Sequence, residues 1–436
     1  MKVAFATLGC RVNQYESEAM AEKFIKDGYE IVKFDEYSDV YVINTCTVTN
    51  MGDRKSRQMI GRARRLNNNA VIAVVGCYSQ VAPDEVSSIE GVDVVLGSRN
   101  KGYIVYWVNR AREEKSKVVE VKDVLRNKVF EELSIETYQD RTRAFLKIQD
   151  GCNRFCSYCL IPYARGGVCS KSPDKVIEEV KELAKHGFKE IILSGIHIAS
   201  YGVDLDEDIS LVDILEKINE VEGIERIRIG SIDPTFFTEG VMDRISKLKK
   251  LCPHFHLSLQ SGSNATLKRM NRRYTAEEYL NIVTELRKRI PDVSITTDVI
   301  VGFPGETEEE FTETYNFLKN IKLTKTHVFK YSPRKGTAAV KLKDNVTGSE
   351  KERRSAELIS LNNENEKAFI EKFIGREMEV LYEQESSKDK GYYEGYTPNY
   401  IKVVTALENE DVVGKIIKTK LVKLEEEFAY GESVEL

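Results

Sequence analysis

Three cysteines stand close together in the segment GCNRFCSYC. They are Cys152, Cys156 and Cys159, separated by three and then two residues. Thiolates at this spacing can bind three irons of one [4Fe–4S] cube, and the fourth iron then stays open for another ligand. Structural zinc usually takes four ligands, and this loop holds no fourth Cys or His. Because Cys169 lies beyond the following IPYARGG, we interpret it as an adventitious thiol. The spacing therefore favours an iron–sulfur cluster with an open iron.

Three further cysteines share a different placement. Cys10, Cys46 and Cys77 stand in TLGC, INTC and VVGC, and each directly follows an apolar run. Residues just past the carboxyl ends of parallel strands meet at one edge of a sheet, so we expect these thiols to converge. Cysteine is also common as a small core residue. The repeated placement after a strand favours a second three-cysteine cluster site, again with an open iron.

The elements that position the second cysteine set form an alternating series. Apolar strands separated by amphipathic helices indicate a parallel sheet covered on both faces. The expected strands are Val3–Leu8, Val40–Asn44, Val71–Val75 and Val92–Leu96, and the helices include Tyr15–Lys26 and Asp53–Leu66. The sequence therefore predicts an N-terminal α/β domain over 1–113, followed by a charged connector over 114–137.

A second series of strands and helices begins at Ala144. The expected strands are Ala144–Ile148, Glu190–Leu193, Arg226–Ile229, His254–Leu259, Ser294–Val301 and Lys325–Phe329. The helices between them include Pro173–His186, Leu211–Val221, Ala276–Ile290 and Glu308–Ile321. Six such units predict an open, partial (β/α)6 barrel, with the GCNRFCSYC loop at its carboxyl face, where active sites form. With a helical extension over Glu350–Phe373, this domain covers 138–370.

The last part of the chain, 371–436, changes to short strands. The expected strands are Glu377–Tyr382, Tyr392–Tyr396, Tyr400–Val404, Val412–Lys418 and Phe428–Tyr430. Five short strands fit a small antiparallel β-barrel of OB-like size. The fold class is therefore α/β, with a parallel sheet domain, a partial barrel and a small C-terminal β-barrel.

Long motifs resemble a known family. The GCNRFCSYC loop and the barrel resemble the radical S-adenosylmethionine (SAM) enzymes, and two three-cysteine sites in this order resemble the methylthiotransferases, whose C-terminal domain is the TRAM domain. Further similar segments are Ile161–Gly166 (IPYARG), Ser258–Ser263 (SLQSGS), Thr297–Thr307 (TDVIVGFPGET) and Tyr331–Thr337 (YSPRKGT). The opening TLGCRVNQYES resembles the members that act on threonylcarbamoyladenosine in tRNA. Gly167 and Cys169 stand where the family commonly carries basic residues.

The resemblance implies a function and its cofactors. It implies two [4Fe–4S] clusters and methylthiolation at C2 of N6-threonylcarbamoyladenosine, next to the anticodon at tRNA position 37, with two SAM molecules used per product. An electron donor such as flavodoxin or ferredoxin and a sulfur source would be partners. The alternatives are the same chemistry on isopentenyladenosine tRNA or on a ribosomal protein aspartate, and a non-catalytic iron–sulfur RNA-binding regulator.

The resemblance also implies residues that contact SAM. Tyr158 matches the position whose backbone meets the adenine, and Ser194 and Gly195 match the position that receives the methionine amino group. Gln260 and Asp298 end barrel strands and are further candidates for SAM or substrate contact. His254 and His256 alternate along one strand, so both should line the barrel or its core.

Basic and aromatic residues are candidates for RNA contact. Phosphate binding requires Lys and Arg, whatever base sequence is recognised. The candidates on the barrel loops are Lys268, Arg269, Arg272, Arg273, Arg334 and Lys335, and a basic helix spans Arg54–Arg65. The alternative for that helix is that its charges are simply solvated and contact no RNA. Tyr392, Tyr393, Tyr396 and Tyr400 could stack on unpaired bases or simply fill the small barrel.

The composition sets limits on these interpretations. The chain has 436 residues, of which 41% are hydrophobic and 31% charged, with 65 Lys and Arg against 70 Asp and Glu, a net charge of −5. This composition supports several packed cores and excludes a histone-like basic protein. We expect no membrane span and no signal peptide, hence a cytoplasmic protein whose cysteines are thiols or metal ligands rather than disulfides.

Overall fold

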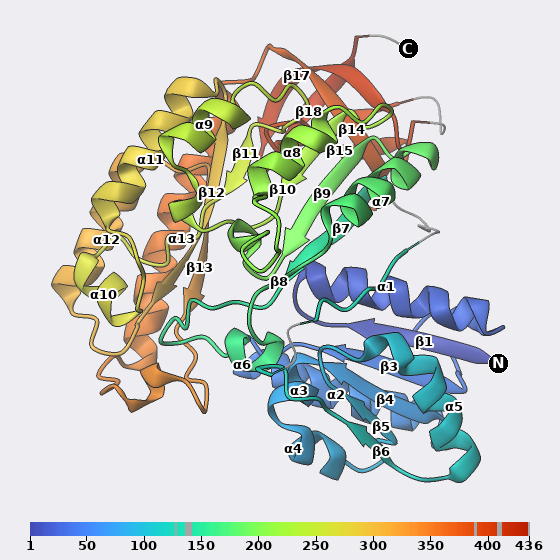
Figure 1. Ribbon diagram of the computed structural model, residues 1–436. Coiled ribbons are helices and arrows are strands. Elements are labelled where there is room, and N and C mark those ends of the chain that lie inside the picture. Colours follow the sequence, from blue (N-terminus) through green and yellow to red (C-terminus); the bar gives the residue numbers. More distant parts are fainter. Residues whose placement is uncertain (127–128, 136–141, 388–389, 408–411, 435–436) are drawn as a thin grey trace.

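The chain folds into three domains that pack against one another (Figure 1). This computed structural model describes residues 1–126, 129–135, 142–387, 390–407 and 412–434. The N-terminal domain, in blue, and the C-terminal barrel, in red, contact different parts of the large central barrel domain. Among the described residues, no helix has both the length and the apolar character needed to cross a membrane.

Six parallel strands form the sheet of the N-terminal domain, in the order β2-β1-β3-β4-β5-β6. The strands are β1 Lys2–Thr7, β2 Glu30–Val32, β3 Val40–Thr45, β4 Val71–Gly76, β5 Val94–Leu96 and β6 Val118–Glu120. The helices are α1 Arg11–Lys26, α2 Asn50–Leu66, α3 Cys77–Val81, α4 Pro83–Ser88 and α5 Ile104–Glu114, with a short 3-10 turn η1 at Lys101–Tyr103. Phe24 of α1 and Val108 of α5 cover one face, and Ile60 of α2 and Val86 of α4 cover the other. This arrangement confirms the expected sheet covered on both faces.

The expected connector over 114–137 is wrong at its beginning. Glu114 is the last residue of α5, and β6 pairs with β5 as the final strand of the sheet. A three-residue strand is too short to produce a clear alternation pattern, which explains why the sequence did not predict it. Residues 127–128 and 136–141, including the expected boundary between 137 and 138, lie outside the described residues.

Six parallel strands also form the barrel domain, which confirms the expected open barrel. They are β7 Arg143–Asp150, β9 Glu190–Gly195, β10 Arg226–Ile229, β11 His254–His256, β12 Ser294–Val301 and β13 Lys325–Lys330. The order is β10-β9-β7-β8 in one part and β11-β12-β13 in the other, and isolated bridges such as Ile232 to Leu257 join the two. The two-residue strand β8, Cys169–Ser170, runs antiparallel to the end of β7. Because β8 and β13 are not paired, the barrel is open on that side.

Helices surround the barrel strands on the outside (Figure 1). They are α7 Pro173–Lys185, α8 Leu211–Asn219, α9 Glu239–Ile245, α10 Asn264–Arg269, α11 Ala276–Arg289, α12 Glu308–Ile321 and α13 Gly348–Glu371, with 3-10 turns η2 Ile198–Ser200, η3 Pro234–Phe236 and η4 Ala338–Lys341. The short helix α6, Ile161–Arg165, lies instead beside α3 of the N-terminal domain. One large apolar cluster fills the layer between strands and helices, for example Ile191 of β9 against Val180 of α7.

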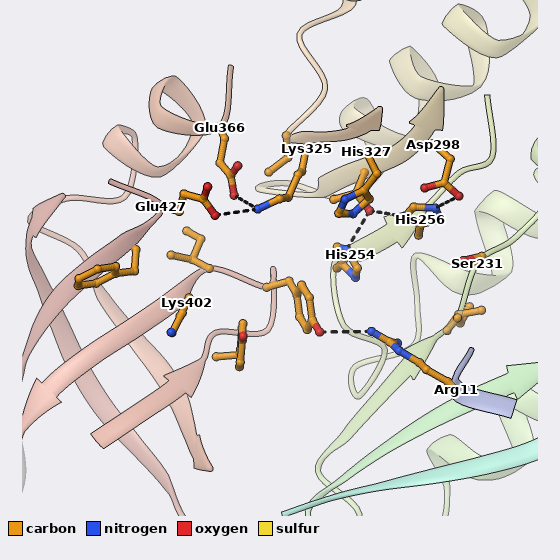
Figure 2. Close-up of a pocket in the computed structure, with 18 of the residues that line it drawn as sticks. Arg11, Ser231, His254, His256, Asp298, Lys325, His327, Glu366, Lys402 and Glu427 are labelled. Atoms are coloured by element: carbon orange, nitrogen blue, oxygen red, sulfur yellow. Dashed lines mark hydrogen bonds and ion pairs between the residues drawn. The ribbon is translucent and has the colours of Figure 1, made fainter. Parts of the chain in front are cut away.

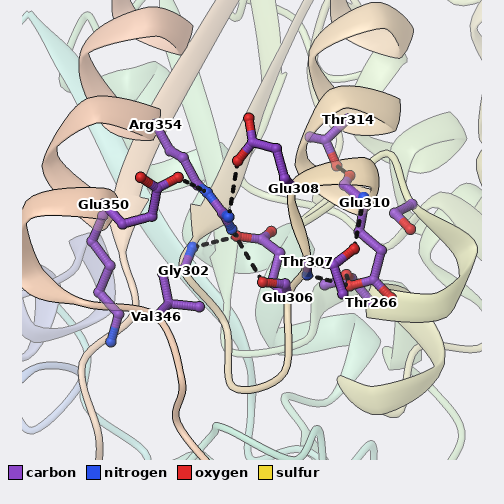
Figure 3. A network of polar contacts seen from close by, with 12 residues as sticks. Thr266, Gly302, Glu306, Thr307, Glu308, Glu310, Thr314, Val346, Glu350 and Arg354 are labelled. Atoms are coloured by element: carbon purple, nitrogen blue, oxygen red, sulfur yellow. Dashed lines mark hydrogen bonds and ion pairs between the residues drawn. The ribbon is translucent and has the colours of Figure 1, made fainter.

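A buried arginine fixes the long helix α13 against the turn after β12 (Figure 3). Arg354 donates to Glu306 at 2.8 Å, to Glu350 at 2.8 Å and to Glu308 at 3.2 Å. Glu306 also accepts from the Gly302 backbone N–H at 2.6 Å, and Gly302 has a φ of +68° that favours glycine. The turn GFPGET is therefore held in place from two sides.

The C-terminal part forms a closed five-stranded barrel in the order β14-β15-β16-β18-β17. The strands are β14 Glu377–Glu385, β15 Tyr392–Tyr396, β16 Lys402–Ala406, β17 Ile416–Glu425 and β18 Phe428–Ser433. This confirms the expected small barrel, with one difference in detail. The pair β16 and β18 is parallel, whereas the other pairs are antiparallel as expected.

Candidate functional site

The first cysteine set lies on the loop that follows β7, at the carboxyl end of the barrel. Backbone N–H groups of Arg154 and Ile161 donate to the Sγ atoms of Cys152 and Cys159, each at 3.4 Å. The backbone N–H of Ser157 donates to the carbonyl of Met270 at 3.0 Å. The loop is thereby attached to the end of α10, and its thiols receive donors that favour the thiolate form.

Arg272 belongs to this cysteine site rather than to an RNA-facing surface. Its Nη1 donates to Cys156 Sγ at 3.4 Å, and its Nη2 donates to the Ser258 carbonyl at 3.2 Å and lies 3.3 Å from Asp233. Its side chain is only 8% exposed. The expected phosphate contact for Arg272 is therefore wrong, because the guanidinium is turned inward and its donors are already used.

The second cysteine set gathers at one edge of the N-terminal sheet, as the strand pattern predicted. Cys10, Cys46 and Cys77 follow β1, β3 and β4. Cys46 and Cys77 are buried and Cys10 is exposed. Gly9 has a φ of +100°, and a Cβ at that position would lie 2.7 Å from the Cβ of Cys46. Glycine is therefore required here for the first loop to approach the second.

The two donor sets suit iron–sulfur clusters. Burial raises the pKa of Cys46 to about 11 and that of Cys159 to about 12, so these thiols ionise readily only beside a strong cation such as iron. In the part of the chain that the structure describes, no three His, Cys, Asp or Glu residues converge as a site for one metal ion. A cube with one open iron takes three thiolates, and each cysteine set supplies three free cysteines.

The short helix α6 connects the two cysteine sites. It begins at Ile161, just after Cys159, and ends at Arg165, whose Nε donates to Cys77 Sγ at 3.2 Å. Arg165 is fully buried and its Nη atoms donate to Glu16 of α1 at 2.5 and 3.1 Å. Glu16 also contacts Lys147 of β7 at 2.8 Å. The N-terminal domain and the barrel domain are therefore joined by a buried charge network beside both sites.

A chamber of about 1050 Å³ lies where the three domains meet (Figure 2). The N-terminal domain contributes Cys10 and Arg11, and Ile161 comes from the start of α6. The barrel strands contribute Ser194, Gly195, His254, His256, Thr296, Asp298, Lys325 and His327, and the C-terminal barrel contributes Tyr396, Tyr400 and Lys402. The chamber thus adjoins a ligand of one cysteine site and the segment that follows the other.

The C-terminal barrel closes this chamber at the amino ends of the barrel strands. Tyr400 stacks on His254 with ring centroids 4.6 Å apart and on Tyr396 at 4.8 Å, and Arg228 lies 4.5 Å above its ring. Arg228 also donates to the Pro398 carbonyl at 3.0 Å. Tyr396 and Tyr400 are therefore used inside the molecule, and Tyr393 fills the small barrel's core. This placement corrects the interpretation of these tyrosines as stacking platforms for bases.

The expected SAM contacts occupy different places. Ser194, Gly195 and Asp298 line the chamber, where Asp298 lies 3.2 Å from His256. The ring of Tyr158 packs edge-on against Phe303 in the turn after β12, at 6.3 Å between centroids. Gln260 is 9% exposed, and its backbone N–H donates to the Asp298 carbonyl at 2.8 Å. That these five residues contact SAM stays a prediction.

The remaining RNA candidates divide into paired and exposed residues. Arg334 is buried and donates to Thr47 and Asp53, both at 2.6 Å, which removes it from the surface set. Arg269 is partly exposed and pairs with Glu310 at 2.9 Å. Lys268, Arg273 and Lys335 are exposed. On α2, Arg57, Arg62 and Arg64 pair with Glu85, Asp35 and Glu90, in keeping with ordinary solvated charge.

Gly167 and Cys169, which stand where the family commonly carries basic residues, both lie inside the structure's packing. The carbonyl of Gly167 accepts from Arg99 at 2.8 Å, and Cys169 is buried in β8.

Several residues that form the site were not predicted from the sequence. Arg11, Arg165, Lys147 and Arg228 were given no role. Lys147 and Arg228 could have been found, because each is a charge inside an otherwise apolar parallel strand, where charges are rare unless paired. Arg11 and Arg165 lie within the family-like segments TLGCRVNQYES and IPYARG, but nothing local in the sequence indicates what either side chain contacts.

Comparisons with known proteins agree with this architecture. Residues 146–318 match the family model described as the radical SAM superfamily, and residues 2–97 match the model described as uncharacterized protein family UPF0004. The threonylcarbamoyladenosine tRNA methylthiotransferase MtaB of Bacillus subtilis is 44% identical, covering 99% of this chain and 96% of that protein. The protein of the same name from Aquifex aeolicus is 42% identical, covering 96% and 99%. A tRNA-2-methylthio-N(6)-dimethylallyladenosine synthase of Clostridium tetani is 37% identical, covering 98% and 95%.

Solved structures show a similar fold at low sequence identity. The radical SAM methyltransferase TsrM of Kitasatospora setae has a TM-score of 0.55 at 14% identity, covering 76% of this chain and 73% of that one. The cobalamin-dependent radical enzyme OxsB has a TM-score of 0.52 at 13% identity, covering 85% and 56%. These likenesses concern the fold alone.

Proposed function

The chain belongs to the threonylcarbamoyladenosine tRNA methylthiotransferase family, and we propose that it inserts a methylthio group at C2 of N6-threonylcarbamoyladenosine next to the anticodon of tRNA. The observation that carries this proposal is the match of nearly the whole chain to enzymes of that name at 42–44% identity. The chamber supports it, because one cavity is lined by Cys10 of one cysteine set and by Ile161, which closely follows Cys159 of the other.

We further propose two [4Fe–4S] clusters, one on Cys152, Cys156 and Cys159 and one on Cys10, Cys46 and Cys77. When bound, these groups supply a radical from SAM and the sulfur that is transferred, chemistry that an unactivated aromatic C–H bond requires. We also propose two SAM molecules per product, an electron donor such as flavodoxin or ferredoxin, and a separate sulfur source. Because the substrate is tRNA, we place the enzyme in the cytoplasm.

The protein's own residues position the reactants and exclude water. Gly9 allows the Cys10 loop to approach Cys46, and Arg165 holds α6 between the two sites. Tyr400 closes the chamber from the C-terminal barrel. Holding both reactants in one cavity makes the transfer effectively intramolecular. For RNA, the exposed Lys268, Arg273 and Lys335 are the remaining proposed phosphate contacts among the predicted set.

Nucleoside mass spectrometry of tRNA tests this function. We expect 2-methylthio-N6-threonylcarbamoyladenosine in cells with the gene and only the unmethylthiolated nucleoside in cells without it. Complementation by a Cys152/Cys156/Cys159→Ala variant should fail, although that protein should keep the iron of one cube, about four atoms. Loss of 2-methylthio-isopentenyladenosine instead would assign the enzyme to the other tRNA substrate. An unchanged nucleoside profile would exclude a tRNA substrate and favour the protein substrate or the regulator.

A further inference from the structure

Among the described residues, one cation of the chamber has no carboxylate partner. Three described Lys and Arg side chains line it: Arg11, Lys325 and Lys402. Lys325 pairs with Glu366 at 2.8 Å and with Glu427 at 3.4 Å (Figure 2). Lys402 pairs with Glu394 at 3.0 Å. Arg11 instead contacts neutral groups, donating to the Tyr400 hydroxyl at 3.4 Å and lying 5.6 Å from the Phe145 ring centre. Of the described lining residues, Arg11 alone therefore offers an uncompensated positive charge.

Two further arginines lie beside Tyr400, the residue that Arg11 contacts. Arg143 and Arg228 lie 5.7 and 4.5 Å from the Tyr400 ring centre, share the buried carboxylate of Glu190 at 3.8 and 2.8 Å, and Arg143 also pairs with Glu383 at 2.6 Å. Burial alone would raise the pKa of Tyr400, but Arg143, Arg11 and Arg228 outweigh it and hold that pKa below its ordinary value. This end of the chamber therefore favours an anion.

Acidic residues gather at a different part of the chamber wall. Glu366 comes from α13, and Glu394, Glu425, Glu426 and Glu427 come from the C-terminal barrel, while Asp298 of β12 lies beside His256. Lys325 is shared by Glu366 and Glu427, so this part of the wall has more carboxylates than cations. An anionic group inside the chamber would be repelled by this acidic side and attracted to the Arg11 side.

The proposed substrate carries its anionic group within reach of Arg11. In adenine, C2 and C6 both flank N1, so a substituent on N6 lies on the same side of the ring as the reacting carbon. The threonylcarbamoyl substituent ends in a carboxylate, whereas an isopentenyl substituent has neither charge nor a hydrogen-bonding group. Arg11 directly follows Cys10, a proposed ligand of the site that would hold the transferred sulfur. The residue after that cysteine can therefore meet the N6 substituent.

We propose that Arg11 binds the carboxylate of the threonylcarbamoyl group and thereby selects threonylcarbamoyladenosine over adenosines with a neutral N6 substituent. This inference rests on the proposed function. A planar guanidinium binds a carboxylate through two parallel hydrogen bonds, and a neutral substituent would leave its donors without partners in a closed cavity. Arg11 is thus a specificity-determining residue of the substrate site.

The test removes the charge from the substrate and from the protein in turn. The reconstituted full-length enzyme is assayed with an anticodon stem-loop RNA that carries threonylcarbamoyladenosine, and with the same RNA after methyl esterification of the carboxylate. With the native enzyme, the ester should lower both kcat/KM and equilibrium affinity by about 10- to 100-fold, the value of a charged hydrogen-bonded pair. With Arg11→Gln, esterification should change kcat/KM and equilibrium affinity by less than about 3-fold, because the guanidinium that would bind the carboxylate is already absent.

Control variants separate the charge from other effects. Arg11→Lys keeps the positive charge, and Lys402→Gln removes a chamber cation that already has a carboxylate partner. In both variants, methyl esterification of the RNA should therefore still cause most of the loss of kcat/KM and affinity seen with the native enzyme; this loss is the ester penalty. Iron content and the circular dichroism spectrum check that each variant folds and binds its clusters.

Three results would overturn the inference. The first is a native enzyme that accepts the ester as well as the acid, a measurement that needs no variant. The second is an ester penalty that persists in Arg11→Gln. The third is an Arg11→Gln variant with a raised KM for SAM and an unchanged ester penalty, which would mean that the guanidinium binds SAM rather than the RNA carboxylate. If the native enzyme makes no product from the threonylcarbamoyl RNA, the proposed function itself falls, and the inference falls with it.

Discussion

At the scale of single residues, a glycine determines whether the second cysteine set can assemble. Gly9 precedes Cys10, and its φ of +100° belongs to a region that other residues rarely adopt. A side chain there would also collide with Cys46, 2.7 Å from its Cβ and 2.8 Å from its Sγ. The loop after β1 and the loop after β3 are therefore adjacent only because this position has no side chain.

Replacing Gly9 by Ala should remove the second cluster without removing a ligand. We expect the iron content after anaerobic reconstitution to fall by about four atoms per chain, the content of one cube. SAM cleavage at the barrel site should continue under strong reductant, while no methylthio product forms. Gly28→Ala is the matched control, because Gly28 has a similar φ of +83° with nothing within 4 Å. Equal iron content in the two variants would contradict the role of the Gly9–Cys46 contact.

At the scale of elements, a shared carboxylate holds α1, α6 and β7 together. Glu16 of α1 accepts from Arg165 and Lys147, and Lys101 lies 3.3 Å away. Burial would raise the pKa of Glu16, but these three cations outweigh it and hold the pKa well below its ordinary value. The charge of Glu16 therefore compensates several buried cations at once.

Glu16→Gln should lower the free energy of unfolding by about 3–5 kcal/mol at pH 7, since it leaves buried cations without their shared partner. Glu357→Gln is the control: it removes an exposed pair with Arg353 at 2.6 Å and should cost less than about 1 kcal/mol. Because the folded pKa of Glu16 is depressed, its contribution is complete above the unfolded pKa of about 4.3 and is lost as the pH falls. Urea unfolding of the cluster-free protein should therefore show a Glu16→Gln difference in unfolding free energy that is constant from pH 7 to about pH 5 and narrows as the pH falls below about 4. A difference that is constant with pH would contradict this account.

At the scale of the whole molecule, the C-terminal barrel is part of the chamber rather than an appended domain. Its backbone carbonyls accept from arginines at the amino ends of the barrel strands. Arg226 donates to the carbonyls of Tyr396 and Glu379 at 3.1 and 3.0 Å, and Arg228 donates to that of Pro398 at 3.0 Å. Both arginines are buried. Without the C-terminal barrel both arginines would lose these carbonyl acceptors, and Arg228 would keep Glu190 at 2.8 Å.

Deleting the residues after Gly375 should therefore lower the free energy of unfolding of the remaining chain by several kcal/mol. Each of Arg226 and Arg228 should account for about 1–3 kcal/mol, because each loses its carbonyl acceptors. Thermal unfolding should show a lower midpoint for the truncated protein than for the full chain. Arg228→Met provides the internal check: it should destabilise the full chain more than the truncated one, where the arginine has lost its carbonyl acceptors and keeps only Glu190. Equal midpoints for the full and truncated chains would show that the two barrels are independent.

Local patterns in the sequence determined the elements and the two cysteine groups. Strand and helix periodicity predicted the parallel sheet, the six barrel strands and the small C-terminal barrel, because these patterns depend only on residues a few positions apart. The spacing of Cys152, Cys156 and Cys159, and the strand-end placement of Cys10, Cys46 and Cys77, are equally local. Their role as cluster ligands stays a prediction.

Only the tertiary structure decided which side chains meet across domains. Arg272 and Arg334 look like surface cations in the sequence, but the structure turns both inward. Tyr400 looks like a stacking platform, yet it closes the chamber beside Arg11, 389 positions away in the chain. Such contacts depend on how separately folded layers pack, and no short-range pattern records that packing. This is why the sequence alone predicted the chemistry, whereas the chamber and its unpaired cation became visible only in the folded chain.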